Sequence, residues 1–172
     1  MSLKQGISLT IRNVVVALTI GVLFASTNAL AATGFRSTDW NLQHNEQLFC
    51  LAKNVYFEAR GESKRGKEAV AHVTLNRVES YKFPNSICNV VKQRSRNTCQ
   101  FSWVCKNYHY NIPWNSPPWK ESVLVAKQVL DGNTVDPTDG AMFFHATYVR
   151  PSWSRTLRKT ADIGNHIFYK AV

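Results

Sequence analysis

The sequence predicts an α+β domain in which helices dominate and one small sheet is present. Three segments carry apolar residues at helical spacing, and two short segments near the C-terminal end are typical of strands. The chain has 172 residues, of which 44% are hydrophobic and 19% are charged, and this size and composition fit one globular domain. No repeat is visible and only one long apolar run occurs, which excludes a solenoid and a membrane protein with several spans.

The first predicted helix covers residues 46–60. Its apolar residues recur at helical spacing and form a single stripe, made of Leu48, Leu51, Ala52, Val55 and Ala59. Asn45 is a suitable N-cap and Gly61 a suitable stop signal. A second helix is predicted over 67–78, where apolar residues leave almost no polar face, and such a helix is normally buried.

The remaining elements follow from turn residues and aromatic content. A third helix is expected to begin at Ser116-Pro117-Pro118-Trp119, because proline suits a first turn, and to end at Asp131-Gly132-Asn133. We expect turns over 81–89 and 136–140, and strands over 141–148 and 163–169. Residues 93–118 are predicted to form a long loop that a disulfide braces and that can include a small hairpin.

The N-terminal residues have the pattern of a secretory signal. Lys4 and Arg12 flank an apolar run over 14–25, and Ala29-Leu30-Ala31 is a small-residue cleavage site. A retained anchor is the alternative, but a run of about a dozen residues is shorter than the roughly 20 that span a bilayer. We therefore predict a signal peptide over 1–31, an N-terminal arm over 32–45 and a single domain over 46–172, with no stable membrane insertion after cleavage.

Export favours disulfides over metal for the four cysteines. Four cysteines can form two disulfides in three different ways. Cys99 and Cys105 are close enough to close a short loop, which leaves Cys50 with Cys88. A zinc site is the rival, but no spacing is C-x-x-C and no histidine follows at a zinc-like interval, so neither a metal nor another cofactor is expected.

The charge of the chain favours anionic partners. The formal net charge is +10, and removal of residues 1–31 lowers it by two to +8. Such a domain is attracted to nucleic acid, lipid headgroups or an anionic wall polymer. Because no nucleic-acid recognition motif is visible, nucleic acid is not expected as a partner.

Glu58 is the candidate catalytic residue. At 100° per residue it lies about 80° from the centre of the apolar stripe, at its edge. Partial burial there raises the pKa of a carboxyl, as a general acid requires. The alternative is a surface glutamate paired with a lysine or arginine. Glu62 is either a second catalytic carboxylate or, as we favour, a cap or surface pair. A structural role in the core or at its rim is favoured for each histidine.

Several ordered motifs resemble one family. The motifs are Cys50-Leu-Ala-Lys-Asn-Val-Tyr-Phe-Glu58-Ala-Arg-Gly-Glu62, Gly66-Lys-Glu-Ala-Val-Ala-His-Val-Thr-Leu-Asn-Arg77, Cys99-Gln-Phe-Ser-Trp103, Phe144-His-Ala-Thr-Tyr-Val-Arg-Pro-Ser-Trp153 and Ile163-Gly-Asn-His-Ile-Phe-Tyr169. They are similar to the SleB-type cell-wall hydrolases, the spore-cortex-lytic enzymes, over roughly residues 46–170. The four cysteines resemble exported forms from Gram-negative bacteria and phages. No peptidoglycan-binding repeat is present, so sporulation is not implied.

The resemblance implies a mainly helical, lysozyme- or transglycosylase-like catalytic domain with a small antiparallel sheet. It implies a monomer in the periplasm or cell envelope that cleaves peptidoglycan between N-acetylmuramic acid and N-acetylglucosamine. Glu58 would be the single general acid and base of a lytic transglycosylase. The expected substrate-binding residues are Gln100, Phe101, Ser102, Trp103, Thr74, Asn76, His145, Tyr148 and Trp153. For Phe101 and Trp103, and for Thr74 and Asn76, packing is an equal alternative.

Three other functions remain open from the sequence. If Glu62 lay across the cleft from Glu58, muramidase-type hydrolysis of the same bond would become the better interpretation. A zinc amidase or peptidase would instead cut the stem peptide. A non-catalytic module would bind the wall without releasing product.

Overall fold

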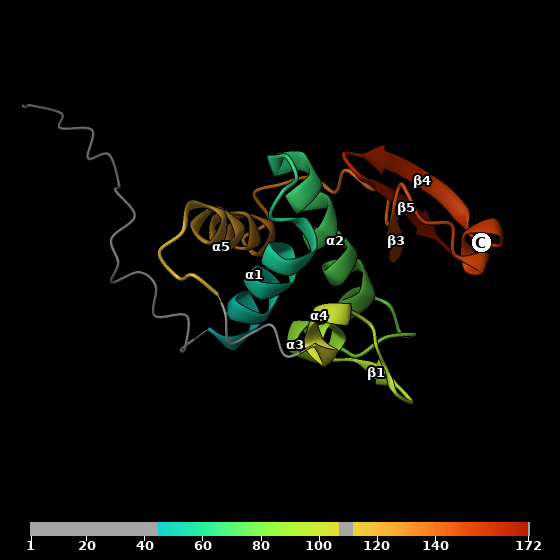
Figure 1. Cartoon of the computed structure of the whole chain (residues 1–172), viewed down its shortest axis with the longest axis horizontal. Coiled ribbons are helices and arrows are strands. Elements are labelled where there is room, and N and C mark those ends of the chain that lie inside the picture. Colours follow the sequence, from blue (N-terminus) through green and yellow to red (C-terminus); the bar gives the residue numbers. More distant parts are fainter. Residues whose placement is uncertain (1–44, 107–111, 172) are drawn as a thin grey trace, which may run out of the picture. The chain divides into compact units, whose positions relative to one another are not determined.

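The computed structural model describes residues 45–106 and 112–171 (Figure 1). The predicted signal peptide and all of the predicted arm except Asn45 lie outside these residues. Helix α1 (Glu46–Ala59) has the predicted start, because the Asn45 side chain accepts a hydrogen bond from the Leu48 amide at 3.0 Å. Within the described residues, no helix is both long and apolar enough to cross a membrane.

Two further long helices confirm the predicted helical segments. Helix α2 (Lys64–Glu79) begins three residues earlier than expected, because Ser63 caps it through the Gly66 amide. Helix α5 (Pro117–Leu130) begins after Ser116 as predicted, and Ser116 accepts from the Trp119 amide. The three helices α1, α2 and α5 pack against one another (Figure 1). They form the scaffold that carries Glu58.

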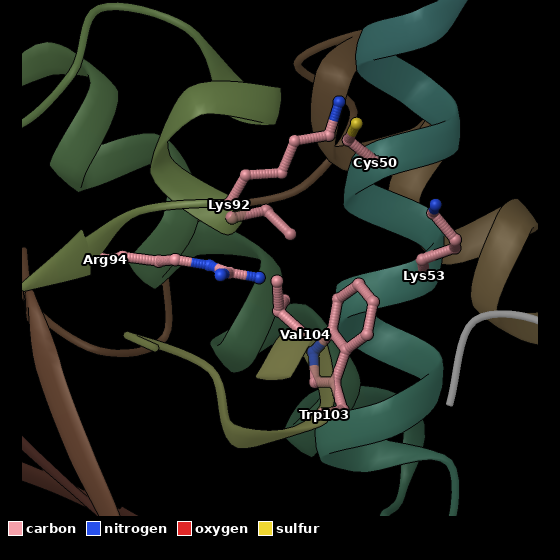
Figure 2. A pocket seen from close by; sticks show the side chains of 7 residues that line it. Cys50, Lys53, Lys92, Arg94, Trp103 and Val104 are labelled. Atoms are coloured by element: carbon pink, nitrogen blue, oxygen red, sulfur yellow. The ribbon is translucent and has the colours of Figure 1, made fainter. Parts of the chain in front are cut away.

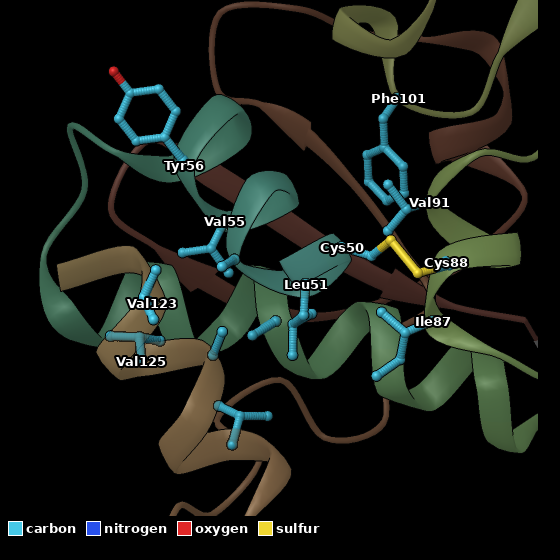
Figure 3. Packing of buried hydrophobic residues seen from close by; sticks show 14 of the residues in the cluster. Cys50, Leu51, Val55, Tyr56, Ile87, Cys88, Val91, Phe101, Val123 and Val125 are labelled. Carbon is cyan, nitrogen blue, oxygen red and sulfur yellow. A yellow bond between two sulfur atoms is a disulfide. The ribbon is translucent and has the colours of Figure 1, made fainter. Parts of the chain in front are cut away.

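The main core lies where the apolar stripe of α1 meets its neighbours (Figure 3). Leu51 and Val55 of α1 are completely buried, and Val123 of α5 is almost so. The disulfide between Cys50 and Cys88 joins α1 to helix α3 (Ile87–Val91) at the edge of this core. The prediction of a turn over the whole of 81–89 is therefore wrong at its end, because Ile87 is buried and Ser86 caps a short helix.

The predicted loop after α3 contains more structure than a loop. Strands β1 (Arg94–Ser95) and β2 (Thr98–Cys99) form the small hairpin that the sequence allowed. Helix α4 (Ser102–Cys105), which the sequence analysis did not predict, follows at once, and the Cys99–Cys105 disulfide closes this segment. Both predicted disulfide pairings are thus present. Part of the predicted loop, residues 107–111, lies outside the described residues.

A three-stranded antiparallel sheet forms the C-terminal part of the domain (Figure 1). Its order is β3 (Phe143–Ala146), β5 (His166–Lys170) and β4 (Arg158–Ile163). The first two correspond to the predicted strands, with shorter bounds. Strand β4 and the 3₁₀ turn over Ser152–Arg155 were not predicted, because both segments are mostly polar and only Ile163, at the end of β4, is buried. The observed α+β architecture confirms the predicted fold class.

Candidate active site

Glu58 lies in the last turn of α1 and lines a cavity of about 730 Å³, called here the Glu58 cavity. Helices α1 and α4 form one wall, and strand β3 with the residues after it forms the other. The lining residues besides Glu58 are Tyr56, Phe57, Arg60, Ser102, Trp103, Phe144, His145, Ala146, Tyr148, Val149 and His166. The cavity is large enough for a sugar-sized ligand and is rich in aromatic rings.

Burial raises the pKa of Glu58 from its ordinary value of 4.5 to about 7, and the positive charge of Arg77 partly opposes this rise. Near neutral pH a large fraction of Glu58 therefore keeps its proton. A carboxyl that is half-protonated at the working pH can both give and take a proton. Among the described residues that line the cavity, only Glu58 carries a carboxyl group.

Arg77 of α2 acts on Glu58 through its charge, and the sequence analysis did not single it out as a site residue. Its side chain is buried, with its guanidinium 5.2 Å from the ring centre of Phe101 and 5.3 Å from that of Phe83. Its Nε donates to the Met142 carbonyl at 2.7 Å, whereas Nη1 has no hydrogen-bond partner among the described residues. Burial lowers the pKa of Arg77 to about 10, so it stays charged at neutral pH. The available signal was an arginine near the end of a segment, 67–78, that was predicted to be a buried helix.

Trp103 is fixed in the cavity wall by a buried chain of hydrogen bonds. Its indole Nε1 donates to Asn54 Oδ1 at 3.1 Å, and Asn54 Nδ2 donates to Thr74 Oγ1 at 3.1 Å. The ring also stacks on Phe57, with centroids 4.7 Å apart. Thr74 is fully buried and does not line the cavity, so in this arrangement it supports Trp103 and has no surface for a ligand.

Asn76 likewise lies outside the cavity and connects α2 to the segment before β3. Its Nδ2 donates both to Asp136 Oδ2 and to the Ala141 carbonyl, at 2.9 Å each. Asp136 also accepts from Thr138 and from the Gly140 amide. These bonds outweigh the effect of burial and lower the pKa of Asp136. The predicted turn over 136–140 is therefore an anchor that positions strand β3.

The predicted residues of the opposite wall are distributed over two cavities. His145 lines the Glu58 cavity, and its ring nitrogens lie 2.9 Å from the Ala146 carbonyl and from the Tyr169 hydroxyl. Tyr148 lies at the rim and is 86% exposed. Trp153 and Gln100 line a separate cavity of about 450 Å³, together with Arg77 and with Phe144, which both cavities share.

Of the remaining predicted residues, Ser102 lines the Glu58 cavity and Phe101 is buried beneath Arg77. Glu62 does not line the Glu58 cavity. Its carboxylate accepts from the Asn165 amide at 3.1 Å and from Asn165 Nδ2 at 2.9 Å, at the turn between β4 and β5. Burial disfavours the charged form of Glu62, but these hydrogen bonds favour it. The net result is that the pKa of Glu62 is lowered.

One group of potential metal ligands occurs in the described part of the chain, made of Glu46, Cys50 and Cys88. The two cysteines are joined in a disulfide, so they offer no thiolate to a metal. This group lies outside the Glu58 cavity.

The comparisons with known proteins agree on one family. The family model described as Cell Wall Hydrolase matches residues 61–169, a region that begins three residues after Glu58. The chain is 35% identical to a spore cortex-lytic enzyme of Bacillus cereus over 130 residues, which cover 74% of this chain and 45% of that protein. The corresponding enzyme of Bacillus subtilis is also 35% identical, over 72% of this chain and 37% of its own length. The chain thus spans less than half the length of these relatives.

A solved structure resembles this chain over most of that structure's own length. It is the catalytic domain of the germination-specific lytic transglycosylase SleB from Bacillus anthracis, with 34% identity and a TM-score of 0.58. The similarity covers 72% of this chain and 93% of that domain. At this level of identity the likeness extends to sequence as well as fold.

Proposed function

Since this chain belongs to the cell wall hydrolase family, we propose that it cleaves peptidoglycan strands between N-acetylmuramic acid and N-acetylglucosamine, with Glu58 as the general acid. The observation that carries the proposal is the raised pKa of Glu58 in a cavity lined by aromatic rings. Aromatic faces stack on sugar rings, and a protonated carboxyl can protonate a glycosidic oxygen at neutral pH.

In the first step, Glu58 gives its proton to the glycosidic oxygen as the bond to the muramyl C1 breaks. Positive charge develops on the sugar ring, and Glu58 becomes a carboxylate. Arg77 favours this charged form of Glu58, because its own positive charge lowers the carboxyl pKa. The buried arginine thereby limits how tightly Glu58 holds the proton that it must release.

In the second step, the muramyl 6-hydroxyl attacks C1 and the Glu58 carboxylate takes the hydroxyl proton. The product is a 1,6-anhydro sugar, and Glu58 returns to its protonated state. Hydrolytic glycosidases generally use a second carboxylate. Glu58 is the only carboxyl among the described lining residues, and Glu62 is bound to Asn165, which favours the transglycosylase outcome.

Product analysis on purified sacculi tests the proposal. The wild type is expected to release muropeptides with anhydro ends, which mass spectrometry separates from reducing ends by one water. Glu58→Gln should keep the fold and abolish release. Reducing ends would instead show a muramidase, and free amino groups with sensitivity to a chelator would show an amidase or peptidase. Binding to sacculi without any soluble product would show a non-catalytic module.

We further propose that residues 1–31 direct export to the periplasm or cell envelope and are then removed, leaving a monomer. The two disulfides support this, since such bonds persist in oxidising compartments. Cell fractionation followed by N-terminal sequencing should find a mature chain that starts near Ala32. A chain with an intact N-terminus in the cytoplasmic fraction would contradict it. Light scattering of the purified mature chain should give the mass of one copy.

A further inference from the structure

A third cavity, of about 280 Å³, shares Trp103 with the Glu58 cavity. We call it the Lys53 pocket, and its lining residues are Cys50, Lys53, Val91, Lys92, Arg94, Trp103 and Val104. Figure 2 shows Lys53 on α1 to one side of Trp103 and Val104, and Arg94 on the other side with its guanidinium pointing toward them. The pocket thus combines an apolar floor with a rim of three cations.

The positive charge of the Lys53 pocket is poorly compensated. Lys92 approaches Glu46 at 3.6 Å, but both side chains are more than half exposed, and such pairs contribute little. In the described part of the chain, neither Lys53 nor Arg94 forms an ion pair with an acid; Lys53 Nζ lies 4.5 Å from the Phe49 ring centre. Burial, and then the charge of Lys92, lower the pKa of Lys53. A bound anion would relieve this repulsion.

The Lys53 pocket lies one helical turn from the Glu58 cavity along α1. Lys53 lines the pocket and Phe57, four residues later, lines the cavity, so they share a face of the helix. One turn corresponds to about 5.4 Å. The Phe57 ring stacks on Trp103, which is the residue common to both cavities. A ligand chain leaving the Glu58 cavity therefore has only a short distance to cross.

From this juxtaposition we propose that the Lys53 pocket binds the carboxylates of the stem peptide on a muramyl residue whose sugar occupies the Glu58 cavity. The inference rests on the proposed function and specifies its substrate as peptide-bearing glycan. A peptide spans about 3.3–3.6 Å per residue, so two or three residues bridge one helical turn. Val91, Val104 and Trp103 contact its aliphatic parts, and Lys53 and Arg94 pair with its carboxylates.

The test compares two polymers with the same glycan. One is a preparation of peptide-bearing strands, and the other is the same preparation after an amidase has removed the peptides. In the double variant Lys53→Gln with Arg94→Gln, kcat/KM should fall about tenfold or more on the peptide-bearing strands, since two charge-assisted bonds are lost. On the stripped strands it should be unchanged. An equal fall on both polymers, or no fall on either, would overturn the proposal.

Matched controls separate a local effect from a general loss of charge or fold. Lys120→Gln removes one positive charge from an exposed site on α5 outside both cavities, and should leave both rates unchanged. Arg94 is exposed, so Arg94→Gln alone gives a folded variant even if the change at Lys53 disturbs α1. It should show a smaller fall in the same direction, again confined to the peptide-bearing strands.

A binding measurement keeps this test independent of catalysis. In the Glu58→Gln background, fluorescently labelled peptide-bearing strands should bind more tightly than stripped strands, and the double substitution should remove that difference. Equal binding of both polymers before the substitution would refute the pocket. A wild type that releases no product from either polymer would refute the proposed function instead, while the binding result would still decide the role of the Lys53 pocket.

Discussion

The last turn of α1 and the turn that follows it each carry a glutamate, and the two behave in opposite ways. Glu58 lies in a cavity wall, where burial raises its pKa to about 7. Glu62, four residues later, accepts two hydrogen bonds from Asn165, and its pKa is lowered. Residue type and position in the sequence do not distinguish the two carboxyls. What distinguishes them is the surroundings that the fold gives each carboxyl: Glu58 is much more deeply buried, whereas Glu62 lies nearer the surface and meets the donors of Asn165.

Burial removes a carboxylate from water and raises the free energy of its charged form. Amide groups that donate hydrogen bonds to the carboxylate offset most of this increase. Glu58 is thereby suited to proton transfer and Glu62 to holding the turn between β4 and β5. Gly164 of that turn has φ +58° and lies against the Glu62 carboxylate, where a larger side chain would not fit. We therefore propose that this contact holds the turn between β4 and β5 and that Glu62, which does not line the Glu58 cavity, takes no part in the reaction.

The largest expected difference between the two glutamates is in catalysis. Glu58→Gln should lower kcat about 10²–10⁴-fold, the usual contribution of a general acid. Glu62→Gln should retain most of the activity and give the same products. Release of soluble muropeptides over time measures both. Comparable losses in the two variants would mean that Glu62 also takes part in the reaction, and would favour hydrolysis.

The next largest expected difference is in how the free energy of unfolding depends on pH through Glu58. The pKa of Glu58 is higher in the folded chain than its ordinary value of 4.5, so the folded state binds this proton more tightly than the unfolded state does. The contribution of Glu58 to the free energy of unfolding therefore falls as pH rises from 4.5 to about 7. Gln does not titrate. The stability of Glu58→Gln relative to the wild type should therefore rise by about 3 kcal/mol between pH 4 and pH 8. Urea unfolding at both pH values measures this, and a constant difference would contradict the raised pKa.

Arg77 should have an intermediate effect, through the pKa of Glu58. Its charge lowers that pKa, so Arg77→Met should move the alkaline limb of the kcat/KM profile upward by about one pH unit. Arg77→Lys retains the charge and should leave the limb near its wild-type position. An alkaline limb that stays in place in Arg77→Met would show that burial alone sets the Glu58 pKa.

The smallest expected effect is that of the substitution Glu62→Gln on the free energy of unfolding. Glu62→Gln should lower the free energy of unfolding at pH 7 by less than about 1 kcal/mol, because the contact with Asn165 is exposed. The pKa of Glu62 is lowered, so its contribution is present above 4.5 and is lost as pH falls through the lower folded value. In thermal melts, Glu62→Gln should therefore differ from the wild type less at pH 3 than at pH 7. An equal loss at pH 3 would indicate a packing effect.

The helical part of the fold was predictable from local patterns. The stripe of Leu51 and Val55, the capping residues Asn45 and Ser116, and the spacing of Cys99 and Cys105 each act within a few residues, and each prediction is confirmed. Strand β4 was not predictable in this way. Most of its residues are polar and only Ile163, at its end, is buried, and the strand is paired with β5, a contact that no local pattern reveals.

The candidate site was predictable only in part. The helical edge position of Glu58 indicated its partial burial, and the structure places it in a cavity wall. The roles of Thr74 and Asn76 were not predictable, because they depend on partners far away in sequence, Asn54 in one case and Asp136 in the other. Arg77 was overlooked because its helix appeared uniformly apolar, and its proximity to Glu58 arises from the packing of α2 on α1.

By itself, the sequence determined the three long helices, the disulfides and which carboxyl borders the core, because periodicity, capping and spacing are local properties. Only the tertiary structure decided that Glu58 is deeply buried while Glu62 accepts hydrogen bonds from Asn165, and that Lys53 and Arg94 line one pocket on either side of Trp103. A pKa and a pocket depend on every group that packs around a side chain, and those groups come from segments that the order of residues along the chain does not bring together.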